Sequence, residues 1–233
     1  MQTLGEKHLI VKTAELMKQL RSQDSANGQP LRILDIGAEK SVVVEDVLTE
    51  QFGPTFECDR TDIVDCTVRH PQVKQCFIAS VENMPQVSSN YYDLAFANYV
   101  LEHIEDLEKA VEEIARVLKP NGFFITSLPN PRAPEFMLAK LTPTSFHQFI
   151  KGQGEGRHAH EIHYAYKNIN QLIDVFEKKF TAVEVRYFPN TYYGYLYRFP
   201  ILNFLSRIYD GLVKTLNIKP LMGNVCLVFR KKI

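Results

Sequence analysis

A chain of 233 residues with 45% hydrophobic content can bury one sizeable core, and we expect a single domain. Lys plus Arg and Asp plus Glu are balanced at 27 each, so no overall field draws the protein to nucleic acid or to an anionic surface. Residues 1–20 carry charges every few positions, which excludes a secretory signal or a membrane span there and favours a cytoplasmic location.

The four cysteines, Cys58, Cys66, Cys76 and Cys226, show no CxxC spacing. This pattern argues against a zinc site and against a redox dithiol. We therefore expect reduced, buried thiols.

Segment 157–163, RHAHEIH, is the strongest candidate for a metal site. Its three histidines and one carboxylate could bind a transition metal through imidazole nitrogens. The spacing is poor, because His158 and His160 share a face only in an extended segment and His163 needs a turn to join them. We predict no bound metal, and favour a role for His160 or His163 in facing the substrate.

Hydrophobic periodicity predicts an amphipathic helix over residues 6–20, a flexible linker and then a first strand that ends at Ile36. Strands and helices alternate after it, which implies a mostly parallel sheet with covered faces. A turn is expected at 119–122, KPNG. The other expected elements are helices at 42–51, 107–118, 168–180 and 200–216 and strands at 56–58, 76–79, 92–98, 123–127, 182–187 and 224–230.

Residues 188–223 form an insertion rich in aromatic side chains between the last two expected strands. Its helix carries Arg207, Asp210 and Lys214, and these charges exclude a membrane-spanning helix. We expect either a lid over a pocket or an element that lies on a surface. The alternative left open is a weak peripheral contact with a membrane through four cations, Arg198, Arg207, Lys214 and Lys219.

The stretch 31–41, LRILDIGAEKS, is an apolar run that ends in an acid and continues into a glycine turn and a helix. Ligands of open α/β sheets bind outside the carboxyl ends of the strands, where this turn lies. Gly37 permits a close backbone approach, but Glu39 stands where a nucleotide-binding turn usually has a second glycine.

Several motifs follow one another in order: LDIG at 34–37, Asp59 after the second strand, SVENMP at 80–85, YYDLAFANYVLEHI at 91–104 and LKPNGFFITSLPN at 118–130. Together they resemble the class I S-adenosylmethionine-dependent methyltransferases, in a form like the type 11 methyltransferase domain. The resemblance is dense over residues 31–130. It implies a Rossmann-like α/β fold with a seven-stranded, mostly parallel sheet, helices on both faces, an antiparallel last strand and a helical, aromatic insertion before that strand.

The resemblance also implies a domain organisation and a cofactor. S-adenosylmethionine would be the methyl donor and S-adenosylhomocysteine the product. The implied parts of the single domain are an N-terminal helix and linker at 1–30, a cofactor-binding core at 31–130, substrate-side or lid elements at 131–187 and 188–223, and the last strand at 224–233.

Cofactor-binding residues carried over from the family begin with Asp35, which would hold the methionyl amino group. Gly37 and the amides of Ala38 and Glu39 would approach the methionyl and ribose parts. Asp59 would accept hydrogen bonds from the two ribose hydroxyls, with Glu57 and Asp62 as rival candidates.

Two positions depart from the family pattern. Glu39 replaces the middle glycine and adds a negative charge near the cofactor carboxylate, so we expect weaker affinity, with Lys40 as a compensating charge. Ser80 replaces an aspartate that bonds the adenine amino group. Val81 would contribute its amide to the adenine ring, and Met84 its apolar surface.

Candidate catalytic residues follow the fourth strand. Asn98 and Tyr99 would line the cavity beside the transferable methyl, where Asn98 would contact the cofactor and orient the acceptor. His103 is a candidate general base, because imidazole titrates near neutral pH. His163 is the third candidate, on the substrate side.

We predict a methyltransferase that acts on a small or lipid-like acceptor, at oxygen, without nucleic acid as a partner. The alternative is a catalytically silent methyltransferase-like scaffold, motivated by Glu39 and Ser80, in which Glu39→Gly would restore cofactor affinity. A dinucleotide-dependent oxidoreductase is disfavoured because the loop lacks GxGxxG spacing.

Overall fold

The computed structural model describes residues 3–23, 28–134, 165–189 and 200–233. Its helices and strands follow the expected order with boundaries shifted by a few residues. They are α1 (Leu4–Gln23), β1 (Leu31–Ile36), α2 (Val43–Phe52), β2 (Phe56–Asp62), β3 (Val73–Ile78), β4 (Tyr92–Asn98), α3 (Leu107–Val117), β5 (Leu118–Pro129), α6 (Ile169–Phe176), β6 (Phe180–Phe188), α7 (Pro200–Thr215), a short 3₁₀ helix (Lys219–Leu221) and β7 (Asn224–Lys231).

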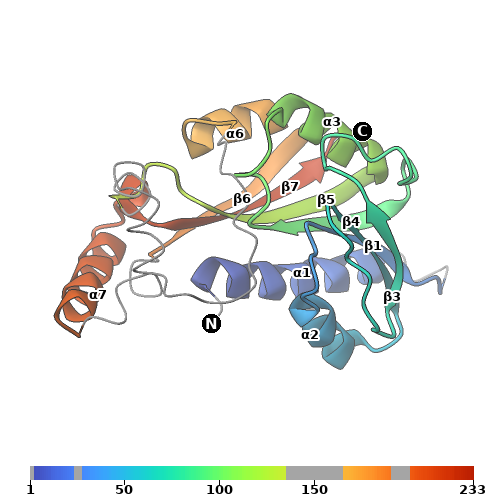
Figure 1. Cartoon of the computed structure of the whole chain (residues 1–233), viewed down its shortest axis with the longest axis horizontal. Coiled ribbons are helices and arrows are strands. Elements are labelled where there is room, and N and C mark those ends of the chain that lie inside the picture. The colour runs from blue at the N-terminus through green and yellow to red at the C-terminus, as the bar shows by residue number, and fades with distance from the viewer. Residues whose placement is uncertain (1–2, 24–27, 135–164, 190–199) are drawn as a thin grey trace.

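The strands form one seven-stranded sheet in the order β3-β2-β1-β4-β5-β7-β6. The pairs among β1 to β5 are parallel, and β7 runs antiparallel to both β5 and β6. Helices α1 and α2 lie on one face of this sheet, and α3 and α6 lie on the other (Figure 1). The predicted fold class is confirmed.

Each face of the sheet has its own apolar core, because successive strand residues point to opposite sides. In β4, Leu94 and Phe96 pack in the cluster under α1 and α2, whereas Ala95 and Ala97 belong to the cluster under α3 and α6. The small alanines leave room for α3, whose buried residues recur at helical spacing. The carboxyl ends of the parallel strands are left free for a site.

The turn expected at 119–122 lies within β5, which already begins at Leu118. Asn121 has a φ of 65°, and a Cβ on Gly122 would lie 2.9 Å from the carbonyl oxygen of Lys119. Residues 119–122 therefore form an irregularity within β5 instead of a separate turn, at the point where the register between β4 and β5 shifts.

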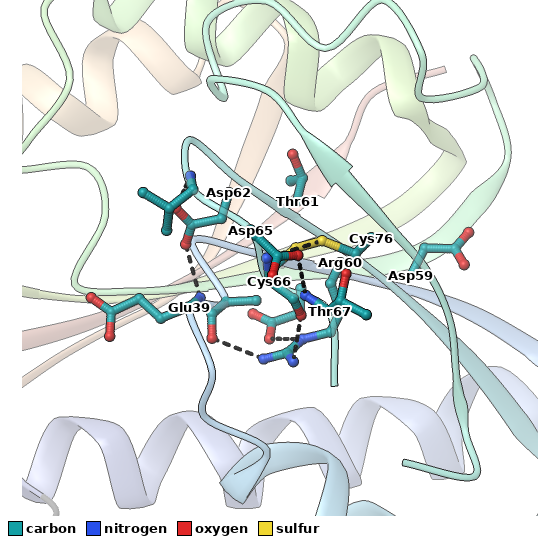
Figure 2. Close-up of a disulfide and its surroundings, with 12 residues drawn as sticks. Glu39, Asp59, Arg60, Thr61, Asp62, Asp65, Cys66, Thr67 and Cys76 are labelled. Atoms are coloured by element: carbon teal, nitrogen blue, oxygen red, sulfur yellow. Dashed lines mark hydrogen bonds and ion pairs between the residues drawn. A yellow bond between two sulfur atoms is a disulfide. The ribbon is translucent and has the colours of Figure 1, made fainter. Parts of the chain in front are cut away.

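A disulfide joins Cys66, after β2, to Cys76 in β3, with the two Cα atoms 5.8 Å apart (Figure 2). The prediction of reduced thiols is wrong for these two residues and holds for Cys58 and Cys226, which are free and buried. Spacing along the chain missed the bridge because parallel pairing of β2 and β3 brings the two cysteines together. Disulfides are more typical of oxidising compartments than of the cytosol.

Among the described residues, no helix combines the length and the apolar character that crossing a bilayer requires.

Candidate functional site

A cavity of about 230 Å³ lies at the carboxyl edge of the sheet, where β1, β2, β3 and β4 end. Ligands of open α/β sheets bind at this edge. The residues that line it are Ile36, Gly37, Glu39, Thr61, Asp62, Ile63, Ala79, Ser80, Val81, Glu82, Tyr99, Val100, His103, Ile104 and Glu105.

Gly37 forms the floor of the cavity after β1. Its φ of 73° lies in the left-handed region, and a Cβ at this position would lie 2.2 Å from Cγ2 of Val100. Both the backbone conformation and the contact with Val100 therefore require glycine. Gly37 is thus part of the cavity wall, and its approach to the cofactor stays a prediction.

The backbone amides after β1 donate within the protein. Those of Gly37 and Ala38 donate to the carbonyl oxygen of Thr61, at 2.8 and 3.4 Å, and that of Glu39 donates to Oδ2 of Asp62 at 2.8 Å. Ala38 is buried outside the cavity lining, so the role expected for its amide is not supported. Glu39 is exposed on the wall with a φ of 43°, so it retains a glycine-like backbone conformation.

Asp62, rather than Asp59, is the acid at the edge of β2. The register pairs Asp59 with Leu34 in the middle of the sheet, and the Tyr92 hydroxyl donates to its Oδ2 at 2.8 Å. Figure 2 shows Asp62 next to Glu39 and Asp59 well apart from them. Asp62 lines the cavity and Asp59 does not, although the ribose role of either residue stays a prediction.

Asp35 does not line the cavity either, because its side chain lies on the opposite side of β1 in a buried charge cluster. Nε of Arg60 lies 3.6 Å from Oδ2 of Asp35 and 3.2 Å from Oε1 of Glu45. Burial raises the pKa of both carboxyls, and the neighbouring Glu45 raises that of Asp35 further. Asp35 thus takes part in a buried ion pair, and its contact with a methionyl amino group stays a prediction.

Arg60 connects this cluster to the underside of the cavity loop. It is fully buried, and its guanidinium donates to the carbonyl oxygens of Ala38 at 2.8 Å, of Cys66 at 3.1 Å, and of Ser41. These bonds hold the turn after β1 against the loop after β2. Sequence inspection missed Arg60, since an arginine inside a strand carries no ligand signal by itself.

Ser80 and Val81 line the cavity as expected, whereas Met84 is buried in the core beside it. Ser80 Oγ lies 3.2 Å from Oε2 of Glu82 and accepts a hydrogen bond from the Glu82 amide. Oε1 of Glu82 accepts from the amide of Asp106, the N-cap of α3, at 2.5 Å. The wall segment is thus fixed to α3.

Of the candidate catalytic residues, His103 and the neighbouring Tyr99 line the cavity. Asn98 does not, and its buried Oδ1 has no hydrogen-bond partner among the described residues. Tyr99 has a φ of 58°, with its hydroxyl 2.5 Å from Oδ1 of Asn224 and 2.9 Å from Oγ1 of Thr3. His163 lies outside the described residues, as does the whole segment 157–163. In the described part of the chain, no group of three or more His, Cys, Asp or Glu side chains could hold a metal ion.

The cavity wall is acidic. The lining includes four carboxylate residues, Glu39, Asp62, Glu82 and Glu105, and its described residues include no Lys or Arg. Such a wall favours a ligand with positive charge and disfavours phosphates. The signal for Glu82 was already in the motif SVENMP, but its side chain could be placed on the wall only by the fold.

The disulfide ties β3 to a loop that contacts the cavity turn. Nζ of Lys40 lies 2.6 Å from Oδ2 of Asp65 and donates to the carbonyl oxygen of Thr67 at 3.1 Å. Asp65 and Thr67 stand on either side of Cys66 (Figure 2). The ion pair with Lys40 lowers the pKa of the Asp65 carboxyl. Lys40 is therefore engaged with this loop.

We expect Cys76→Ser to destabilise the protein by about 3 kcal/mol, because the unfolded chain is no longer constrained by a bridge between cysteines 10 residues apart. Thermal unfolding of the oxidised wild type, the reduced wild type and the variant measures the effect. Cys226→Ser, which removes a buried free thiol, is the control, and it should not respond to reductant differently from the wild type. Equal stability of oxidised and reduced wild type would contradict the expectation.

A family model described as a methyltransferase domain matches residues 34–126, which include the end of β1, the acidic wall and most of β5. This segment of the chain is similar to the methyltransferase domain family. S-adenosylmethionine, the cofactor expected from the sequence, is the cofactor of that family. The matched segment ends before α6, so the similarity covers most of the parallel strands β1 to β5, and the carboxyl ends of β1 to β4 border the cavity.

Curated relatives of this methyltransferase domain carry different names. The chain is 32% identical over 112 residues to the zebrafish (Danio rerio) arginine-hydroxylase NDUFAF5, mitochondrial, covering 46% of this chain and 33% of that protein. It is 34% identical over 103 residues to the sterol 4-C-methyltransferase strm-1 of Caenorhabditis elegans, covering 42% and 27%. The chain thus spans about a third of the length of the curated relatives it matches.

Solved structures share the fold. The CurJ carbon methyltransferase has a TM-score of 0.59 at 16% identity, covering 98% of this chain and 55% of that chain. A Burkholderia thailandensis 1,6-didemethyltoxoflavin-N1-methyltransferase, crystallised with 1,6-didemethyltoxoflavin and S-adenosylhomocysteine, has a TM-score of 0.53 at 17% identity, covering 96% and 79%. The [4+2]-cyclase SpnF has a TM-score of 0.53 at 14% identity, covering 94% and 81%, so the fold by itself does not decide the reaction.

Proposed function

We propose that this protein is an S-adenosylmethionine-dependent methyltransferase that acts on a small or lipid-like acceptor, at oxygen. The observation that carries the proposal is the acidic cavity at the carboxyl edge of the sheet, built on the Gly37 turn. Its four carboxylates suit a ligand that combines a sulfonium and an ammonium group.

The cavity residues fit this cofactor in type. Asp62 accepts amide hydrogen bonds at both oxygens, from Glu39 at Oδ2 and Val64 at Oδ1, which fixes its carboxylate at the edge of β2. Each carboxylate oxygen keeps a further lone pair, so Asp62 is the proposed acceptor for the ribose hydroxyls. Ser80 and Val81 are the proposed residues for the adenine, and the loop that carries them is fixed to α3.

Catalysis in this proposal needs few protein groups, because the bound sulfonium already supplies both the methyl group and its leaving group. The protein aligns the acceptor and removes its proton. His103 is the proposed base because it lines the cavity, and Tyr99 is the proposed positioning residue. Relatives named sterol and thiol methyltransferases support an acceptor of low polarity.

A pair of isosteric variants tests the cofactor site. We expect Asp62→Asn to weaken the binding of S-adenosylmethionine about tenfold or more in calorimetric titration, because a hydrogen bond to a charged group contributes about 1.5–3 kcal/mol. Asp59→Asn, the matched control on the same strand, should leave affinity within about twofold, since it can still accept from Tyr92. Equal losses in both variants would argue against Asp62 as the ribose ligand.

The second candidate is a methyltransferase-like protein that does not transfer methyl groups. Glu39 motivates it, because a side chain stands on the cavity wall where the family has glycine. Relatives named arginine-hydroxylase, of which the match covers about a third, also support this candidate. If folded wild type fails to bind S-adenosylmethionine while Glu39→Gly binds it, this second candidate replaces the first.

A further inference from the structure

Helix α7 presents an apolar stripe to solvent. Five of its residues, spaced one or two turns apart on one face, are 46–75% exposed, and Leu216 just after it is 64% exposed. The stripe is defined here as Ile201, Phe204, Leu205, Ile208, Leu212 and Leu216. In Figure 1, α7 stands apart from the helices that cover the sheet.

The amphipathic pattern of α7 is inverted relative to a helix that packs on its own core. Among the α7 residues whose burial is described, Ser206 and Val213 are the most buried, at 4% and 3% exposure, so a hydroxyl faces inward while larger apolar side chains face outward. An ordinary surface helix turns its apolar stripe toward the core. Burial within the described fold therefore does not account for the stripe.

Hydrogen bonds connect α7, through residues 221–223, to the same edge of the sheet as the cavity. The Tyr209 hydroxyl donates to the carbonyl oxygen of Leu221 at 3.0 Å. Nδ2 of Asn130, directly after β5, donates to the carbonyl oxygen of Met222 at 2.8 Å. The backbone amide of Asn130 donates to the carbonyl oxygen of Gly223. The stripe therefore lies near the edge of the sheet at which ligands of open α/β folds bind.

The charges beside the stripe are cationic. Arg207, Lys214 and Lys219 are exposed, whereas Asp210, the acidic residue of α7, is only half-exposed. A helix with Leu, Ile and Phe on one face and Arg or Lys beside it has the composition of helices that lie in the headgroup region of a bilayer. Anionic headgroups would pair with these cations.

We propose that α7 docks on an anionic lipid surface and lies in its headgroup region, so that the cavity edge faces the bilayer. The inference builds on the proposed function by assigning the acceptor to lipids or lipid-dissolved molecules. A second copy of the chain fits the stripe less well. Stacking two such helices would bring Arg207 and Lys214 of one copy near the same cations of the other, and the described residues of α7 include no exposed acid to neutralise them.

Vesicle binding by the full chain tests the proposal. Sedimentation with vesicles of phosphatidylcholine, with and without phosphatidylserine, should show binding that depends on the anionic lipid. We expect Phe204→Ser and Ile208→Ser each to lower the partition coefficient about tenfold or more. Lys214→Gln and Lys219→Gln should each lower it about fivefold on the anionic vesicles. Ile78→Ser removes a side chain of similar exposure, 60%, on the edge strand β3 and is the matched control.

The outcomes separate this proposal from the proposed function. Absence of binding to anionic vesicles, or an equal loss in Ile78→Ser, overturns it. Concentration-dependent dimerisation that Phe204→Ser abolishes, with no vesicle binding, assigns the stripe to a second copy instead. Calorimetric titration with S-adenosylmethionine should give the same affinity for these variants as for wild type. A wild type that binds vesicles but not S-adenosylmethionine would overturn the proposed methyltransferase function and leave the lipid-docking proposal standing.

Discussion

Arg60→Met is expected to destabilise the protein by about 3–5 kcal/mol, because it leaves the carboxyls of Asp35 and Glu45 buried without their cation. It also removes the guanidinium bonds to the carbonyl oxygens beneath the cavity turn. Urea unfolding measures the free energy of unfolding, and calorimetric titration measures the accompanying loss of S-adenosylmethionine binding.

Two further variants make the Arg60 prediction specific. Arg32→Met removes a partly exposed arginine that pairs with Glu57 on the same two strands, and should cost about 0–1 kcal/mol. Adding Asp35→Asn and Glu45→Gln to Arg60→Met should recover part of the loss, since no charge then remains buried. A single Arg60→Met variant as stable as Arg32→Met would refute the account of this cluster.

The pH dependence of Arg60→Met follows from the same cluster. Burial raises the pKa of Asp35 and Glu45 in the folded state, so the folded state binds their protons more tightly than the unfolded chain does. This contribution to stability is present below the ordinary carboxyl pKa and is lost as the pH rises toward the raised values. Without Arg60 the values rise further, so the variant should be more stable at about pH 5 than at about pH 8.

Gly37→Ala is expected to cost roughly 2–5 kcal/mol, from left-handed strain and from overlap with Val100. Because Val100 lines the cavity, displacing it should also weaken S-adenosylmethionine about tenfold or more, equivalent to about 1.4 kcal/mol. Thermal unfolding and calorimetric titration measure the two effects.

Gly53→Ala is the matched control for Gly37→Ala. Gly53 has a φ of 56° and no atom within 4 Å of its would-be Cβ, so only backbone strain of about 1–3 kcal/mol remains. Val100→Ala added to Gly37→Ala removes the overlapping methyl and should restore part of both losses. Equal effects of Gly37→Ala and Gly53→Ala would show that contact with Val100 does not matter.

The sequence alone determined the succession of elements and the place of the site. The spacing of apolar residues in α3 and β4 indicates a helix and a strand without any tertiary information, and β4 was predicted with its observed bounds. The glycine turn after β1, SVENMP and YVLEHI identified the family and led to Gly37, Ser80, Val81 and His103 on the cavity wall.

Tertiary structure decided which polar side chains reach that wall. Register in the sheet places Asp59 beside Leu34 and leaves Asp62 at the edge, a difference of three residues that periodicity does not resolve. Asp35 meets Arg60 because the two residues are paired across β1 and β2. The Cys66–Cys76 bridge and the outward stripe of α7 also depend on how segments distant in sequence are packed. A local pattern specifies what an element is, whereas long-range register and packing specify which of its side chains meet.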